Sequence, residues 1–351
     1  MGMTGFWHGR RVFVTGHTGF KGAWLCLWLE RLGAKVSAFA LPPETEPSLH
    51  DLAGPWQGQH HTFGDLRSLD LVTRAMKAAD PQVVIHMAAQ ALVRPGYRDP
   101  VGTFASNVMG TVHVLEAARQ LSELEAVVVV TSDKVYENHD EGRPFAEGDR
   151  LGGKDPYSNS KACAELVTQC YRDSYFRSGA RVATARAGNV IGGGDWAEAR
   201  IVPDLVRALD GDVPVVLRYP DAVRPWQHVL EPLSGYLAYA QALAEGRELP
   251  PALNFGPRAE SFLTVSQIVD AFSEHFDGRP GWSVDPGEHP PEAGLLMLDH
   301  DLATRALGWR PRLSMADTIH WTAAWYHDWR MGGDARALTL AQIDRYQDLR
   351  P

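Results

Sequence analysis

The stretch VTGHTGFKG, from Val14 to Gly22, decides the fold of this chain of 351 residues. It follows the β-branched run RVFVT at 11–15 and opens an amphipathic segment at 20–32. Glycines let the backbone turn tightly and approach a diphosphate, and the free amides of a helix N-terminus then face the negative charge. A plain strand-to-helix turn could carry the same GxxGxxG spacing. The context favours a dinucleotide-binding loop made by Gly16, His17, Thr18, Gly19, Phe20, Lys21 and Gly22.

Beyond this loop, short β-branched runs alternate with amphipathic stretches. Strands are predicted at 35–40, 81–87, 126–132 and 181–187, and helices at 68–78, 99–120 and 155–177. Such alternation indicates βαβ units whose parallel strands end at one ligand-binding edge. The predicted fold class is therefore α/β, a Rossmann-type doubly wound parallel sheet with a smaller C-terminal α/β lobe that binds substrate.

After residue 189 the pattern loosens, and glycines and prolines become frequent. We expect a dinucleotide-binding domain at 1–189, with segments at about 226–256 returning to it, and a second lobe at 190–351. Helices are predicted at 262–276 and 315–329. Three tryptophans of the latter, Trp321, Trp325 and Trp329, repeat at i, i+4 and i+8, which indicates an apolar packing face or part of a dimer surface.

The bulk composition excludes several classes of protein. The formal charge is −9 and the hydrophobic share is 44%, so a basic face for nucleic acid is not expected. The longest aliphatic stretch, 126–130, is too short to cross a membrane, and no signal peptide is visible. Three scattered cysteines without CxxC spacing indicate a reducing compartment, so the predicted location is cytoplasmic.

The histidines do not predict a metal site. His60, His61, His86 and His289 have no HExxH-like spacing, so no metal is expected. His86 lies in a predicted buried strand and is interpreted as a hydrogen-bonded core residue.

The end of the second strand bears on which dinucleotide is bound. That strand runs into Leu41-Pro42-Pro43, without an acid for a ribose hydroxyl and without Arg or Lys for a 2′-phosphate. We therefore favour NAD over NADP. Asp65 either accepts a hydrogen bond from the adenine amino group or caps the helix predicted near Ser68.

Two further sets of residues carry chemistry. Tyr157 and Lys161 stand four apart on a predicted helix, where the ammonium can lower the pKa of the phenol and make it a base. Such a pair exchanges hydride between a nicotinamide and an alcohol. Ser132-Asp133-Lys134 follows the 126–132 strand and adds an acid and a base, which suits the removal of water. The alternative is a solvated strand end with neighbouring charges.

Together these residues resemble the CDP-glucose 4,6-dehydratase family of the extended short-chain dehydrogenases/reductases. The similarity extends from Phe6 to about Trp329, and Lys134 stands where dTDP-sugar dehydratases have Glu. The stretches that carry it are VTGHTGFKGAWL (14–25), HMAAQ (86–90), NVMGTVHVLEA (107–117), TSDKVYEN (131–138), DPYSNSKACAELV (155–167), RAGNVIGGGDWA (186–197), RPWQHVLEPLSGY (224–236) and NFGP (254–257).

The resemblance implies a lyase that converts CDP-glucose to CDP-4-keto-6-deoxyglucose in deoxysugar biosynthesis for cell-surface polysaccharide (lipopolysaccharide O-antigen). Tyr157 with Lys161 would serve the oxidation at C4, Lys134 would be the base at C5, Asp133 the acid at the 6-hydroxyl, and Ser132 would orient the 4-oxygen. NAD would be recycled, and a homo-oligomer (dimer or tetramer) is expected. The implied NAD contacts outside the loop are Asp65, Leu66, Ala88, Ala89, Gln90, Asn107, Thr131, Tyr157 and Lys161.

On the substrate side, Ser132, Asn189, Arg200, Arg218, Arg224 and Glu292 are candidates, although a single arginine is commonly a surface charge. The chain departs from the family in a shorter 138–152 loop and in Val135, where a Cys is common. Another NAD-dependent sugar-nucleotide dehydratase, a 4-epimerase, a reductase and a non-catalytic NAD-sensing protein remain alternatives. The epimerase and the reductase need no Asp133–Lys134 pair, and a sensor usually lacks the Tyr or the Lys. Dehydration is favoured because all five reactive positions are filled.

Overall fold

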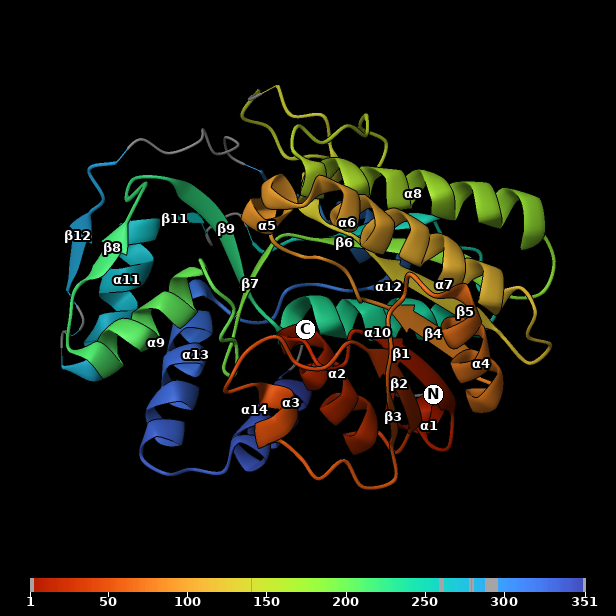
Figure 1. Ribbon diagram of the computed structural model, residues 1–351, viewed down its shortest axis with the longest axis horizontal. Coiled ribbons are helices and arrows are strands. Elements are labelled where there is room, and N and C mark those ends of the chain that lie inside the picture. The colour runs from red at the N-terminus through yellow and green to blue at the C-terminus, as the bar shows by residue number, and fades with distance from the viewer. Residues whose placement is uncertain are drawn as a thin grey trace.

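A seven-stranded parallel sheet forms the centre of the computed structural model, which describes residues 3–139, 141–258, 262–277, 279, 281–287 and 296–349 (Figure 1). The strands lie in the order β10-β6-β5-β4-β1-β2-β3. This is the doubly wound order, and it reverses between β4 and β1, where ligands bind in this fold. The strands are β1 (Arg11–Thr15), β2 (Lys35–Ala40), β3 (His60–Phe63), β4 (Val83–His86), β5 (Ala126–Val130), β6 (Arg181–Ala187) and β10 (Ala252–Phe255).

Helices cover both faces of the sheet. On one face α4 (Leu69–Ala79), α7 (Gly110–Ala118) and α8 (Pro156–Tyr175) enclose a core with Phe13, Val84 and Val127. On the other face α2 (Phe20–Arg31) and α10 (Leu230–Ala244) pack against Val14, Ile85 and Val128. Alternate strand residues therefore point into two separate cores, as a sheet buried on both faces requires.

The segment predicted as one helix at 99–120 is divided, so that prediction was wrong in its continuity. After α5 (Val93–Arg98), α6 (Pro100–Phe104) leads into a π-helical turn at Ala105–Met109 and then into α7. Asn107 lies in this wider turn, and its amide bonds outside the helix to Gln90 and Ser160. Bonds of this kind compete with the regular i→i−4 ladder.

The second lobe, at the left of Figure 1, holds two small sheets. One joins β7 (Asn189–Ile191), β9 (Val223–His228) and β11 (Phe262–Thr264), and the other joins β8 (Val215–Leu217) and β12 (Trp282–Val284). The helix predicted at 262–276 was wrong at both ends: residues 262–264 pair with β9, α11 is Val265–Ser273, and a 3₁₀ turn spans Glu274–Phe276. Thr264 caps α11 in a capping box, which fixes this boundary. The lobe also contains α9 (Ile201–Gly211) and α13 (Met315–Arg330).

The C-terminal half returns to the central sheet. α10 packs on β5 and β6, and β10 pairs with β6. α12 (Asp301–Leu307) lies beside β10, and α14 (Ala335–Asp348) packs on α2 and on α3 (Leu49–Leu52), while the short α1 (Met3–Trp7) contacts α10. The division of the chain at residue 189 stays a prediction.

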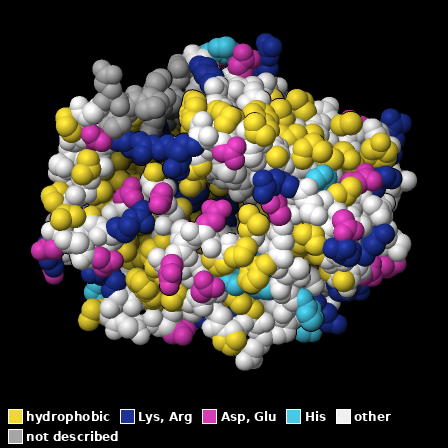
Figure 2. Space-filling model, viewed as in Figure 1, with side chains coloured by type: hydrophobic (Ala, Val, Ile, Leu, Met, Phe, Trp, Pro, Cys, Tyr) yellow, Lys and Arg dark blue, Asp and Glu magenta, His cyan; other side chains and the backbone are white. Residues whose placement is uncertain are grey.

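The tryptophan stripe of α13 is an internal packing face. Trp321 and Trp325 are buried, and Trp329 packs partly buried against the same core, in contact with Trp196. Within the described residues, no helix combines the length and apolar character that crossing a bilayer requires. Acidic and basic side chains are interspersed over the face in Figure 2.

Candidate active site

The glycine loop lies between β1 and α2, at the carboxyl edge of the sheet. Gly16 has a φ of +84°, and a Cβ there would meet the Ala88 amide nitrogen at 2.8 Å. A Cβ on Gly22 would lie 2.0 Å from the Gly16 carbonyl oxygen. The loop thus keeps a bare backbone surface in front of the α2 N-terminus, whose first amides have no partner within the helix. These features fit the diphosphate of a dinucleotide.

Two side chains of the loop form hydrogen bonds with other parts of the fold. Thr18 donates its hydroxyl to the Leu41 carbonyl at 2.9 Å, which ties the loop to the end of β2. Lys21 donates to the Tyr236 hydroxyl at 3.0 Å. Burial and the charge of Lys161 lower the pKa of Lys21 to about 7. Its ammonium therefore belongs electrostatically to the reactive centre, a position the sequence did not indicate.

Asp65 does not cap a helix, so that alternative was wrong. Ser68 is the N-cap of α4 and accepts the Leu71 amide. The Asp65 carboxylate instead accepts hydrogen bonds from Arg67, at 2.8 Å from both its amide and its Nε, and this holds the pKa of Asp65 below its usual value. Its proposed contact with adenine stays a prediction, as does that of Leu66, which packs beneath Gly110.

The loop after β4 is braced from two sides. The Ala88 amide donates to the Thr15 hydroxyl at 3.1 Å, and the Gln90 amide donates to the Asn107 side chain at 2.8 Å. Asn107 also donates to Ser160 on α8 at 2.8 Å. Asn107 therefore acts through the 88–90 loop (Ala88, Ala89, Gln90), and its role in binding NAD would be to position that backbone.

His86 is the hydrogen-bonded core histidine that the sequence predicted. Its ring nitrogens lie 2.7 Å from the Thr15 hydroxyl and 3.2 Å from the Thr111 hydroxyl. Burial lowers its pKa to about 3, so the ring is neutral at pH 7.

Tyr157 and Lys161 lie on the first turns of α8, which Asp155 caps by accepting the Ser158 amide at 3.0 Å. Both side chains are buried. Lys161 donates to the Val130 carbonyl at 3.0 Å, and burial lowers its pKa to about 8, an effect that Glu165 opposes. The expected lowering of the Tyr157 pKa is not found, so that prediction was wrong for this structure. Burial raises it to about 12, and a hydrogen bond with Ser132 offsets only part of the rise.

Ser132, Asp133 and Lys134 follow β5 in a short 3₁₀ turn at Asp133–Val135. The Ser132 hydroxyl donates to Asp133 Oδ1 at 2.8 Å and accepts the Lys134 amide at 3.2 Å. Asp133 is 3% exposed, and its Oδ2 has no hydrogen-bond partner among the described residues. The Asp133 charge raises the pKa of Tyr157 and of Lys21, so the turn lies at the same reactive centre as these two side chains. A buried carboxyl oxygen without a partner costs free energy, which is typical of a functional group.

Glu165 is a functional neighbour that the sequence analysis missed. It accepts hydrogen bonds from Thr131, from Thr184 at 2.6 Å and from both arms of Arg186 at 2.9 and 2.8 Å. It thereby anchors Thr131, the residue just before the 132–134 turn. Its position four residues after Lys161, on the same helix face, was the available signal.

The substrate-side candidates are spread over the second lobe. Arg200 forms an ion pair with Asp195 at 3.0 Å, and its charge lowers the pKa of Tyr157 and of Lys21, which places it beside the reactive centre. Asn189 pairs with Trp226 in the β7–β9 ladder, two residues along from Arg224. Arg218 directly follows β8. Glu292 lies outside the described residues.

Comparison with known proteins gives the family. Residues 12–256 match the family described as the NAD dependent epimerase/dehydratase family. This chain belongs to that family. Its cofactor is accordingly NAD, in agreement with the loop geometry. Over 348 residues the chain is 44% identical to CDP-glucose 4,6-dehydratase of Salmonella typhimurium, with 97% of each chain covered.

Solved structures share the fold. UDP-glucose 4-epimerase of Thermus thermophilus, in complex with NAD, superposes with a TM-score of 0.77 at 28% identity over 90% of this chain and 99% of that one. A dTDP-glucose 4,6-dehydratase of Streptomyces venezuelae superposes with a TM-score of 0.79 at 23% identity over 92% and 98%. The likeness to the latter establishes the Rossmann-type architecture alone.

Proposed function

We propose that this enzyme is a hydro-lyase that converts CDP-glucose to CDP-4-keto-6-deoxyglucose and water. The observation that carries the proposal is Asp133, a buried acid with one oxygen lacking a partner among the described residues, beside Tyr157. Epimerisation and simple reduction require no second acid at this position. The 44% identity to a CDP-glucose 4,6-dehydratase over nearly the whole chain supports the same reaction.

The chain's own groups divide the proton transfers among themselves. Tyr157 takes the proton from the sugar 4-hydroxyl, while Ser132 orients the 4-oxygen. Oxidation at C4 acidifies the hydrogen at C5, and Lys134 removes it. Asp133 protonates the departing 6-hydroxyl. NAD, held by the glycine loop, supplies the hydride acceptor at C4 and, once reduced, the hydride donor at C6.

The electrostatic neighbours of Tyr157 favour its role as a base once the site is filled. Burial and the charges of Asp133 and Asp155 raise its pKa, so the phenolate needs positive charge nearby. Lys161 is buried and Lys21 is half-buried at this centre, and the charge of Arg200 lowers the pKa of Tyr157. We assign Arg200, Asn189, Arg218 and Arg224 to the diphosphate and nucleotide of the substrate, and Glu292 to the nucleotide ribose.

The test is to incubate the protein with NAD and, separately, with CDP-, UDP-, dTDP- and GDP-glucose, and to weigh the products. A product lighter by one water from CDP-glucose alone is expected. Tyr157→Phe is the control and should give none. An unchanged mass with inverted C4 stereochemistry would establish the epimerase instead, and no turnover with NAD still bound would favour the sensor.

We also propose that the enzyme is a homo-oligomer (dimer or tetramer) of the cytoplasm, acting in deoxysugar synthesis for cell-surface polysaccharide. Five large apolar side chains are exposed on consecutive helical elements, α5 to α8: Tyr97, Val101, Met109, Leu166 and Tyr175. Hydrophobic side chains gather over this upper part of Figure 2. Contiguous apolar surface of this kind commonly marks an interface.

Light scattering of the wild type and of Leu166→Glu tests the oligomer. The variant should be monomeric, whereas Val216→Glu, a change at another exposed apolar residue, should leave the oligomer intact. The reducing location is supported by three free cysteines, Cys26, Cys163 and Cys170.

A further inference from the structure

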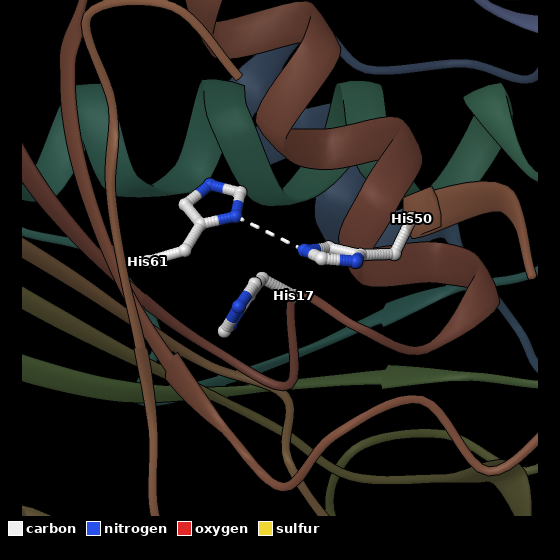
Figure 3. Close-up of side chains that lie close together, drawn as sticks. All are labelled: His17, His50 and His61. Carbon is white, nitrogen blue, oxygen red and sulfur yellow. Dashed lines mark hydrogen bonds between the residues drawn. The ribbon is translucent and has the colours of Figure 1, made fainter. Parts of the chain in front are cut away.

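Three histidines from distant parts of the chain meet beneath the glycine loop (Figure 3). His17 lies in the loop itself, His50 on α3, and His61 on β3. One ring nitrogen from each lies within 4.8 Å of the others. His17 is fully buried and His50 is 7% exposed. The cluster is therefore separate from the backbone surface that faces the dinucleotide.

The outer partners of His50 and His61 fix which ring nitrogens carry hydrogen. His50 Nδ1 lies 3.1 Å from a carboxylate oxygen of Asp51, which can only accept. His61 Nε2 lies 3.1 Å from Gln59 Oε1, and the Gln59 amide nitrogen is held by the Glu30 carboxylate at 2.7 Å, so Oε1 must face the histidine. Both outer nitrogens are therefore donors.

This arrangement turns two lone pairs toward each other. With the outer nitrogens protonated, His50 Nε2 and His61 Nδ1 are both acceptors in neutral rings, yet they lie 3.1 Å apart (dashed line, Figure 3). Two acceptors at that distance need an electrophile between or beside them.

His17 completes the set. Neither of its ring nitrogens makes a hydrogen bond of acceptable geometry among the described residues. The Phe39 carbonyl nearby, which raises the pKa of His17, already accepts the Gly16 amide. A fully buried imidazole whose two ring nitrogens lack a hydrogen-bond partner is suited to ligate a metal.

We propose that His17, His50 and His61 bind a zinc-class divalent transition-metal ion, which ties the dinucleotide loop to the β2–β3 connection. Three imidazoles with an open fourth position suit Zn²⁺, and hard ions such as Mg²⁺ prefer oxygen. Tetrahedral zinc with nitrogen at about 2.0–2.1 Å places its ligand nitrogens about 3.3 Å apart. The His50–His61 spacing of 3.1 Å already matches this value, and the remaining spacings, none of which exceeds 4.8 Å, need to contract by no more than about 1.5 Å.

The surroundings have the outer contacts that metal-bound histidines usually show. Asp51 and Gln59 orient His50 and His61 through the nitrogen that does not face the cluster. Trp56 stacks on His50, with ring centroids 5.4 Å apart, and covers the cluster on one side. The site does not depend on the dehydratase reaction, and its test can succeed or fail whatever that activity proves to be.

The experiment uses the full chain without a polyhistidine tag, stripped of metal by a chelator. Zn²⁺ is titrated in competition with a chromogenic chelator, and Co²⁺ binding is followed by its visible absorption. One ion per chain is expected, and Mg²⁺ should not compete. His50→Asn and His61→Gln should weaken Zn²⁺ binding by more than about 100-fold, since the loss of an outer partner alone costs about 10- to 100-fold.

Two further variants keep the test decisive. His60→Gln is the matched control, because His60 is the exposed neighbour of His61 on β3, and it should bind Zn²⁺ like the wild type. Gln59→Met removes only the outer partner of His61 and should weaken binding by about 10- to 100-fold while leaving all three ligands in place. Absence of Zn²⁺ binding by the wild type, or equal binding in His50→Asn and His61→Gln, would overturn the proposal.

Discussion

Lys161 donates a hydrogen bond from its ammonium to the main-chain carbonyl of Val130, the last residue of β5, at 3.0 Å. The bond joins α8, which carries Tyr157, to the strand that leads into Ser132-Asp133-Lys134. A single buried charge thus fixes the spacing between the two sets of reactive residues. The cost of burying that charge gives a testable consequence for stability.

Lys161→Met should abolish most activity and yet make the protein more stable at pH 7. Burial lowers the pKa of Lys161 from 10.5 to about 8, a cost on the order of 3 kcal/mol while both states are protonated. Between pH 8 and 10.5 the unfolded chain binds the proton that the folded chain has lost, so wild-type stability rises with pH across that window. The free energy of unfolding of Lys161→Met should therefore exceed that of the wild type by its full amount below pH 8, and the excess should vanish by about pH 10.5.

Urea unfolding at pH 7 and pH 10 measures this difference. Lys154→Met, at an exposed lysine just before the same helix, should change stability little at either pH. If Lys161→Met were less stable than the wild type at pH 7, the hydrogen bond to Val130 would outweigh the cost of burial, and the argument would be wrong.

Substitution by alanine should have different effects at Gly16 and at Gly19. A Cβ at Gly16 would need an unfavourable φ of +84° and would meet the Ala88 nitrogen at 2.8 Å, so Gly16→Ala should lose more than about 1–2 kcal/mol of stability. At Gly19 the nearest atom to a Cβ is the Gly16 carbonyl oxygen at 3.5 Å, an ordinary contact. Gly19→Ala should therefore stay within about 0.5 kcal/mol of wild type but weaken NAD binding by about tenfold or more.

Thermal unfolding and NAD titration distinguish the two effects. A loss of stability in Gly19→Ala as large as in Gly16→Ala would mean that the protein itself, and not the cofactor, requires glycine at both positions.

The sequence predicted the parts of the fold and site that local pattern controls. The glycine loop, the strand and the helix on either side of it and the Tyr157–Lys161 spacing depend on neighbours within a few residues, and they form as predicted. Residues 262–264 became a strand because they pair with β9, some forty residues earlier, which no local pattern encodes. The π turn around Asn107 likewise depends on partners in the 88–90 loop and on α8.

Side-chain clusters were harder to predict for the same reason. His17, His50 and His61 have no motif spacing, and they meet because β3 lies next to β2, which lies next to β1. Glu165 and Arg186 pair across α8 and β6, and Lys21 meets Tyr236 only once α10 has returned to the sheet. Sequence reasoning places residues on an edge of the sheet, but only the assembled fold selects which of them touch.

Removing one partner of the buried ion pair between Arg186 and Glu165 should strongly destabilise the protein. Both side chains are about 5% exposed or less, and Arg186 also donates to the Tyr136 hydroxyl at 2.7 Å. Arg186→Met would leave a buried carboxylate without its counter-charge, which costs about 3–5 kcal/mol. Urea unfolding should show this loss. Arg181→Met, which breaks the exposed pair with Glu248, should cost at most about 1 kcal/mol, and a similar loss in both variants would contradict the argument.

Substitutions at Lys134 and Asp133 should leave the oxidation at C4 intact and impair the elimination of water. Lys134→Ala removes the base assigned to C5, so the variant should oxidise the sugar at C4 and stop there. Reduced-cofactor absorbance and a 4-keto sugar of unchanged carbon skeleton should then accumulate on the protein. Asp133→Asn keeps the shape of the side chain that Ser132 contacts but cannot supply a proton, so release of water should slow by about 10²- to 10⁴-fold.

Stopped-flow absorbance and mass spectrometry of quenched reactions follow the two steps separately. Tyr157→Phe provides the comparison, because it should block oxidation itself and accumulate no reduced cofactor. Full turnover by Lys134→Ala would remove Lys134 as the base at C5. The depressed pKa of Lys21, about 7, would then make Lys21 the next group to test, since it shares the electrostatic environment of Asp133 and Lys161.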